Sequence, residues 1–156
     1  MLGNDARAYA PTPSHHDAPG KSAPTTARQK KPLIAVVDDD ATIRRSLDRL
    51  LRAHGCDAIT FGSGCEFLES VAAAPVALHC VVLDMQMPGL DGLEVQRRLR
   101  LLRCELPVIF LSARYNSRAR EAALRGGALA YFTKPLLHDT AVFIHLIAGV
   151  AGDMGR

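Results

Sequence analysis

The chain has 156 residues, 48% of them hydrophobic and 22% charged, and this composition predicts a soluble protein with one globular domain. Its net charge of +3 comes from residues 1–31, because residues 32–156 carry 14 basic and 14 acidic side chains. A domain with balanced charge gives no electrostatic reason to expect nucleic-acid binding, although the basic first segment could contact a polyanion weakly.

Targeting and redox patterns predict a cytoplasmic protein. The four cysteines show no CxxC pair and no zinc-like spacing, so we expect small buried thiols in a reducing compartment. No secretory signal follows Met1, and the longest runs without charged residues, 70–83 and 140–152, are too short to span a bilayer.

The first residues differ from the rest of the chain. Residues 1–31 are rich in Pro and Ala with few large apolar side chains, so they cannot offset their ordering entropy and we predict a disordered tail. The folded domain is expected at residues 32–152. Because only 21 residues follow Pro135, we expect no DNA-binding output domain.

Five short apolar runs are predicted to be strands, and a helical pattern follows each. The strands are expected at Leu33–Val37, Ala58–Phe61, His79–Leu83, Val108–Leu111 and Leu129–Phe132. The helices are expected to begin at Ala41, Ser63, Asp91, Ser117 and Asp139 and to end near Gly55, Pro75, Leu102, Gly126 and Val150. This alternation predicts an α/β fold, a flavodoxin-like (βα)5 doubly wound parallel sheet with strand order 2-1-3-4-5.

Local patterns refine three of the helices. Ser63 with Glu66, and Asp91 with Glu94, have the spacing of a capping box, and Asp139 is expected to cap the last helix. The third helix is expected to turn Leu99 and Leu102 inward.

Polar residues follow four of the predicted strands at one edge of the sheet. They are Asp38 and Asp39 after the first strand, Asp84 after the third, Ser112 after the fourth and Lys134 after the fifth. Strands one and three are neighbours about 4.8 Å apart in the predicted order, so their carboxylates must crowd together. Mg²⁺ would relieve the repulsion; a shared proton is the alternative, but an open rim favours the metal.

These residues also suit phosphoryl transfer. With a cation bound, Asp84 stays ionised and is a nucleophile. The transferred group needs charge neutralisation on its outer oxygens, which Mg²⁺, the Lys134 ammonium and the Ser112 hydroxyl would supply. The pattern therefore predicts an aspartyl-phosphate site. Asp40 is a candidate third ligand, although we favour a role as the N-cap of the first helix.

Four motifs in this order resemble the receiver (CheY-like) domain of two-component response regulators: VVDDD at 36–40, LDMQMPGLDG at 83–92, LSA at 111–113 and YFTKP at 131–135. The resemblance implies a role for each of seven residues: Asp84 as the phosphoacceptor, Asp38, Asp39, Asp84 and the main-chain carbonyl of Gln86 as Mg²⁺ ligands, Lys134 as the phosphate contact, Ser112 as the switch hydroxyl and Tyr131 as the rotating aromatic. It also implies a cis bond between Lys134 and Pro135.

The resemblance further implies a stand-alone receiver in a phosphorelay rather than an enzyme. It would take a phosphoryl group from a sensor histidine kinase or a histidine phosphotransfer protein, lose it at most by self-hydrolysis, and act by changed protein contacts. Ser112 would move toward the phosphoryl group and Tyr131 would fill the vacated space, which couples the site to the face of the fourth helix, fifth strand and fifth helix.

The last helix has an unusual pattern, because residues 141–150 contain no charged side chain. A surface helix that is apolar all round is usually covered, so we expect a homodimer or another protein partner on that face. The alternative is that the N-terminal tail folds over the helix.

Two other functions fit part of the pattern. One is an aspartyl-phosphate phosphatase or phosphotransferase, but haloacid-dehalogenase-like enzymes need a second acid two residues after the nucleophile, where this chain has Gln86. The other is a remnant of a transcriptional regulator that lacks its DNA-binding domain.

Overall fold

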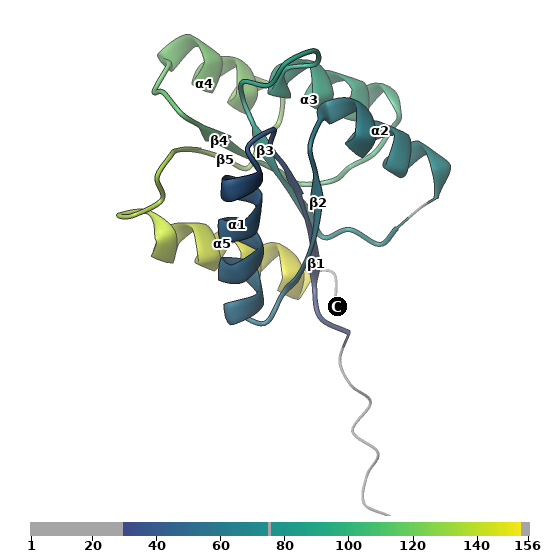
Figure 1. Cartoon of the computed structure of the whole chain (residues 1–156). Helices are drawn as coiled ribbons and strands as arrows, with labels where there is room; N and C mark the ends of the chain where they lie inside the picture. Colours follow the sequence, from purple (N-terminus) through teal and green to yellow (C-terminus); the bar gives the residue numbers. More distant parts are fainter. Residues whose placement is uncertain (1–29, 75, 154–156) are drawn as a thin grey trace, which may run out of the picture.

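The computed structural model describes residues 30–74 and 76–153, which form five strands that alternate with five helices (Figure 1). The strands are β1 (Leu33–Val37), β2 (Asp57–Phe61), β3 (Cys80–Asp84), β4 (Val108–Ser112) and β5 (Ala130–Thr133). The helices are α1 (Ala41–Ala53), α2 (Gly64–Ala73), α3 (Gly92–Leu101), α4 (Ser117–Arg125) and α5 (Thr140–Asp153). The predicted tail, except for its last two residues, and the predicted end of α2 at Pro75 lie outside the described residues.

The sheet has the predicted topology. All neighbouring strands are parallel and their order is β2-β1-β3-β4-β5, which confirms the doubly wound α/β fold. Every predicted strand end is correct to within one residue. The central strands β3 and β4 are buried along their whole length, as their continuous apolar runs predict for parallel strands covered on both faces.

Each face of the sheet has its own core, because successive strand residues point to opposite sides. Helices α2, α3 and α4 cover one face, where Phe67 and Val95 are fully buried. Helices α1 and α5 cover the other, where Leu51 and Phe143 are fully buried (Figure 1). The Phe143 ring meets Phe132 of β5 edge to face at a centroid distance of 5.9 Å. Each such buried side chain contributes about 1.5–3 kcal/mol to stability, so both layers hold the strand ends firmly in place.

The helix starts follow their predicted caps with small differences. Asp40 Oδ1 accepts a hydrogen bond from the Thr42 N–H (2.8 Å), which confirms Asp40 as the N-cap of α1. Ser63 Oγ accepts from the Glu66 N–H (3.2 Å). The Glu66 carboxylate accepts from the Gly62 N–H (2.9 Å), one residue earlier than a standard capping box requires.

The caps of α3 and α5 depart further from the prediction. Asp91 Oδ1 accepts from the Glu94 N–H (2.8 Å), but the Glu94 carboxylate pairs with arginines of the same helix instead of reaching back. At α5 the main-chain carbonyl of Asp139 accepts from the Phe143 N–H (2.8 Å), and no described residue donates a hydrogen bond to the Asp139 carboxylate. Helix α5 continues to Asp153, three residues beyond its predicted end.

Two predictions about burial are wrong. Leu99 is buried as expected, but Leu102 is 50% exposed, because α3 ends at Leu101 and Leu102 is its C-cap. Cys65 is exposed on α2, whereas Cys56 and Cys80 are buried. Burial raises the pKa of Cys80 to about 12, so this thiol stays protonated and acts as a small hydrophobic side chain. In the described part of the chain, none of the helices combines the length and hydropathy that a bilayer crossing requires.

Candidate functional site

The carboxyl ends of β1 and β3 bring three aspartates together. Asp38 and Asp39 directly follow β1, Asp84 ends β3, and the alignment of Val37 with Leu83 places the two strand ends side by side. One carboxylate oxygen of each residue lies within 4.8 Å of one from each of the others. Asp38 and Asp84 are only 2% and 4% exposed, while Asp39 is open to solvent. The site therefore has two buried carboxylates and an exposed third.

Lys134 from the end of β5 completes the charged cluster. Its ammonium nitrogen lies 2.6 Å from Asp38 Oδ2 and 3.2 Å from Asp84 Oδ1, and the side chain is 15% exposed. The Lys134 N–H also donates to the Ser112 carbonyl (2.8 Å), which fixes the backbone beside β4. The peptide bond from Lys134 to Pro135 is cis, as the resemblance implied. A single cation thus bridges the two buried acids.

The electrostatic balance of the cluster is unfavourable. Two unit charges 4 Å apart interact by about 4 kcal/mol at an effective dielectric constant of about 20, which is comparable with the stability of a whole domain. Three carboxylates and one ammonium leave an excess of two negative charges. Such a cluster needs either protons or a further cation.

The pKa values of the two central groups reflect this balance. Burial raises the pKa of Asp84 from 3.8 to about 6, and repulsion from Asp38 adds to the rise, while Lys134 and the Gln86 N–H oppose it. Burial alone would lower the pKa of Lys134. The hydrogen bond to Asp38 and the attraction of both acids outweigh this effect, so the Lys134 pKa is raised and the lysine stays charged. Asp84 therefore takes up a proton at a higher pH than an ordinary aspartate, mainly because it is buried.

The donor set fits a hard divalent cation. Three carboxylates within 4.8 Å of one another, one of them open to water, offer the oxygen ligands that Mg²⁺ prefers and leave room for water or phosphate. Gln86 contributes through its main-chain N–H, which donates to Asp84 Oδ1 (3.3 Å). The ligand role of its carbonyl stays a prediction.

Two residues near the acids were not predicted as part of the site. Arg44 of α1 donates from Nη1 to the main-chain carbonyl of Asp38 (2.6 Å) and so fixes the turn after β1. Gly92 opens α3 directly against the Asp84 backbone, where an added Cβ would lie 2.5 Å from the Asp84 carbonyl oxygen and 2.8 Å from Phe110. Neither contact has a signal in local sequence spacing, although the glycine belongs to the LDMQMPGLDG motif.

The hydroxyl groups of the predicted switch residues, Ser112 and Tyr131, both bond one main-chain carbonyl and do not bond the three aspartates. The buried Ser112 hydroxyl donates to the Arg114 carbonyl (2.8 Å), and the Tyr131 hydroxyl donates to the same oxygen (3.2 Å). Ser112 aligns with Thr133 across β4 and β5, so it lies at the same rim as Lys134. The structure thus places Ser112 beside the cluster, with its hydroxyl engaged by the loop after β4.

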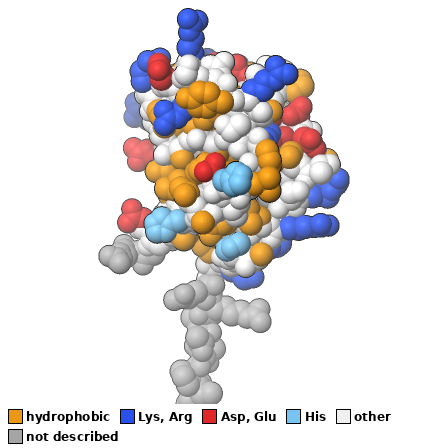
Figure 2. Space-filling model, turned by 90° about the vertical axis from the view of Figure 1, so that its left-hand side faces the viewer, with side chains coloured by type: hydrophobic (Ala, Val, Ile, Leu, Met, Phe, Trp, Pro, Cys, Tyr) orange, Lys and Arg blue, Asp and Glu red, His pale blue; other side chains and the backbone are white. Residues whose placement is uncertain are grey.

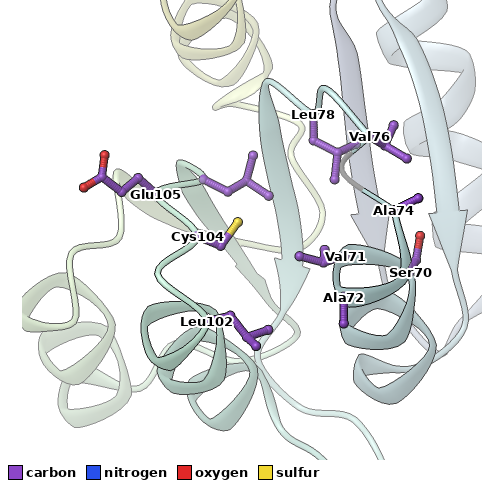
Figure 3. A pocket seen from close by; sticks show the side chains of 10 residues that line it. Ser70, Val71, Ala72, Ala74, Val76, Leu78, Leu102, Cys104 and Glu105 are labelled. Carbon is purple, nitrogen blue, oxygen red and sulfur yellow. The ribbon is translucent and has the colours of Figure 1, made fainter.

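A mostly apolar cavity lies elsewhere in the molecule. It has a volume of about 570 Å³ and lies between the C-terminal parts of α2 and α3, lined by Val71, Leu78 and Cys104 among others (Figure 3). Leu78 precedes β3 and Asp84 ends it, so the cavity is at the opposite end of the strand from the acids. It is therefore not part of the charged site.

The parallel sheet and its rim of three acids and one lysine define a phosphoacceptor domain of phosphorelay signalling. The chain belongs to the response regulator receiver domain family, which it matches over residues 34–144. It is 46% identical to a response regulator receiver protein from Burkholderia phymatum, whose crystal structure aligns with a TM-score of 0.68 over 78% of this chain and 96% of that one.

Curated relatives are longer than this chain. It is 34% identical to Nodulation protein W of Bradyrhizobium diazoefficiens over 131 residues, which are 84% of this chain and 56% of the relative. It is 46% identical to the response regulator MprA of Mycobacterium ulcerans over 65% of this chain and 43% of that protein. The chain therefore spans about half the length of these relatives. Receiver domains are generally phosphoacceptors rather than enzymes, and histidine kinases phosphorylate them.

Proposed function

We propose that Asp84 accepts a phosphoryl group from a sensor histidine kinase or a histidine phosphotransfer protein, with Mg²⁺ held by Asp38, Asp39 and Asp84. The observation that carries the proposal is the Lys134 bridge to both buried acids, at 2.6 Å and 3.2 Å, beside an exposed third acid. This arrangement supports a nucleophile surrounded by groups that neutralise a transferred phosphoryl group.

The hydrogen bonds around Asp84 select one of its oxygens as the nucleophile. Oδ1 forms the ion pair with Lys134 and accepts from the Gln86 N–H, whereas no described residue contacts Oδ2 in this way. Oδ2 would attack phosphorus, an O–P bond would form, and the P–N bond of the phosphohistidine would break, with the imidazole keeping the electron pair and taking a proton from solvent. Bound Mg²⁺ would supply charge neutralisation on the phosphoryl oxygens. Lys134 would turn from Asp84 toward one of these oxygens.

Switching would follow from competition for the Ser112 hydroxyl. Ser112 now donates to the Arg114 carbonyl, and a phosphoryl oxygen on Asp84 would be a stronger, charged acceptor at the same rim. When Ser112 turns away, the Arg114 carbonyl keeps only the hydrogen bond from Tyr131, so the loop before α4 and the ring of Tyr131 can rearrange. The phosphoryl group would thereby bias two arrangements of the α4–β5–α5 face.

The α4–β5–α5 face supports a role in protein contacts, as a homodimer or with another partner. Figure 2 shows hydrophobic side chains mixed with histidines on this side of the molecule. Leu137 and Val142 are 76% and 55% exposed. The rest of the exposed side of α5 is small or polar, since Ile144 and Leu146 pack on the core, so the helix is less apolar toward solvent than its sequence suggests. This leaves a modest contact surface.

The four free cysteines support the cytoplasmic location that we propose, because Cys65 lies exposed and would be open to oxidation in an oxidising compartment. We also propose that phosphate leaves Asp84 only by hydrolysis at its own site, without turnover of small phosphate esters.

Incubation with acetyl phosphate and Mg²⁺ followed by intact mass tests the proposal. We expect one phosphoryl group on the parent and none on Asp84→Asn, with Glu69→Gln, an exposed acid of α2, as the matched control that loads normally. Loading of Asp84→Asn to the same extent as the parent would contradict the assignment. Repeated turnover of small phosphate esters would instead support an enzyme.

A further inference from the structure

The domain has equal numbers of basic and acidic side chains, but basic ones predominate around a groove between α3 and α4. Two adjoining cavities of about 740 Å³ and 320 Å³ lie between these helices and share Gln96, Arg100 and Gly126 in their lining. We call them together the α3–α4 groove. Its charged lining consists of Arg97, Arg100, Arg103, Arg125 and a single acid, Glu105. Figure 1 shows the two helices as neighbours on the same face of the sheet.

Two of the four arginines have no partner in the described part of the chain. Arg97 pairs with Glu94 at 2.7 Å, and Arg125 lies 3.8 Å from Glu121. Arg100 and Arg103 are exposed and form no ion pair with any described residue. Their guanidinium groups therefore keep their full capacity for bidentate hydrogen bonds to carboxylates.

The floor of the groove contains a buried polar side chain that is held in place by a hydrogen bond. Gln96 is only 4% exposed, and its side-chain amide donates to the Ala123 carbonyl of α4 (2.9 Å), which holds the two helices together. No described residue donates to Gln96 Oε1. A Cβ at Gly126 would collide with this oxygen, so the glycine lets the Gln96 amide pack against the end of α4. Gln96 Oε1 is thus an acceptor at the floor of the groove that a ligand N–H could reach.

The uncharged residues that line the groove indicate which class of ligand it would bind. Leu99, Leu106 and Val108 provide an aliphatic floor beneath the arginines of the larger cavity. Among the described residues, no aromatic side chain lines either cavity, so a nucleobase would find no stacking partner there. Carboxylates for the arginines, aliphatic side chains for the floor and a main-chain N–H for Gln96 are features of a peptide.

We propose that the α3–α4 groove docks an acidic segment of a partner protein in which aliphatic side chains alternate with carboxylates. The unpaired guanidinium groups of Arg100 and Arg103 would bind the carboxylates of this segment, as one side of an amphipathic helix could present them. The groove contains none of the three aspartates, so this role goes beyond the proposed phosphoacceptor function and does not require it.

Binding of a labelled peptide tests the groove. The probe is an amphipathic peptide of Glu and Leu, about 18 residues long, with a second peptide in which Lys replaces Glu. We expect the parent protein to bind the Glu peptide only, with affinity that falls as salt is added. Arg100→Glu combined with Arg103→Glu should weaken binding at least about tenfold.

The matched control combines Arg118→Glu with Arg120→Glu, since these exposed arginines of α4 lie outside the lining and give the same change in net charge. It should bind within about twofold of the parent. Equal weakening in both variants, or no binding of the Glu peptide to the parent, would overturn the proposal. So would tighter, groove-dependent binding of a duplex oligonucleotide, or self-association lost in the groove variant. Circular dichroism melts establish that the variants are folded, and Asp84→Asn should bind normally whether or not Asp84 is the phosphoacceptor.

Discussion

Replacement of Asp84 by Asn should stabilise the protein at neutral and alkaline pH. In the folded state burial raises the Asp84 pKa from 3.8 to about 6, so ionised Asp84 is less favourable in the folded chain than in the unfolded one. An acid with a raised pKa contributes its full stability below its unfolded pKa, and this contribution is lost as the pH rises through the folded pKa. The parent therefore loses stability between about pH 4 and pH 6, whereas the Asn variant has no such loss.

The size of the effect follows from the pKa difference. A rise from 3.8 to about 6 corresponds to at most about 3 kcal/mol, and screening by solvent at the open rim reduces it, so we expect roughly 1–3 kcal/mol above pH 7. Lys134 keeps its ion pair with Asp38 in the variant, so the cation is not left unpaired. For a domain of this size the expected gain raises the melting temperature by several degrees.

Urea unfolding without divalent cations, at about pH 4.5 and about pH 8, measures the difference. Asp84→Asn should exceed the parent in stability clearly at the higher pH and little at the lower one. The exposed Glu69→Gln variant should match the parent at both, because its charge is already solvated. A variant less stable than the parent at both pH values, or a gain independent of pH, would refute the reasoning from burial. Added Mg²⁺ should stabilise the parent more than the variant.

Three further outcomes are expected. With limiting Mg²⁺ the rate of loading by acetyl phosphate should fall about tenfold from about pH 7 to about pH 5, as Asp84 becomes protonated; a flat profile followed by intact mass would contradict a pKa of about 6. Lys134→Ala should still load but leave the α4–β5–α5 face unchanged in amide NMR spectra, and a normal spectral shift on phosphorylation would remove the lysine from the switch. Gly92→Ala should lower the free energy of unfolding by about 1–3 kcal/mol, since its Cβ meets the Asp84 carbonyl and Phe110; an unchanged chemical melt would show that α3 can shift freely.

Much of the fold and the centre of the site could be predicted from the sequence, because they depend on local patterns and one topological rule. Buried strands appear as short apolar runs, and βα alternation restricts the sheet to parallel order with right-handed crossovers. Once β1 and β3 are neighbours, the acids at their ends must meet. The strand order was therefore enough to predict that Asp38, Asp39 and Asp84 lie together, and the structure confirms this.

Contacts between residues far apart in the chain could not be predicted in this way. The common acceptor of Ser112 and Tyr131 is the carbonyl of Arg114, and a backbone oxygen leaves no trace in side-chain spacing. The outward position of Leu102 depends on where α3 ends. The solvent side of α5 is less apolar than the sequence suggests because Ile144 and Leu146, which flank the buried residues of the helix, are themselves partly buried against the core.

The sequence by itself determined the order of the elements and the acids at the strand ends, since both follow from short-range periodicity and the fixed geometry of parallel strands. Only the tertiary structure decided that Lys134 spans Asp38 and Asp84, that two hydroxyls share one carbonyl, and that the buried Gln96 amide of α3 bonds the Ala123 carbonyl of α4 beside the arginines. These features arise from side chains on different elements, whose distances are set by packing and not by their separation in sequence.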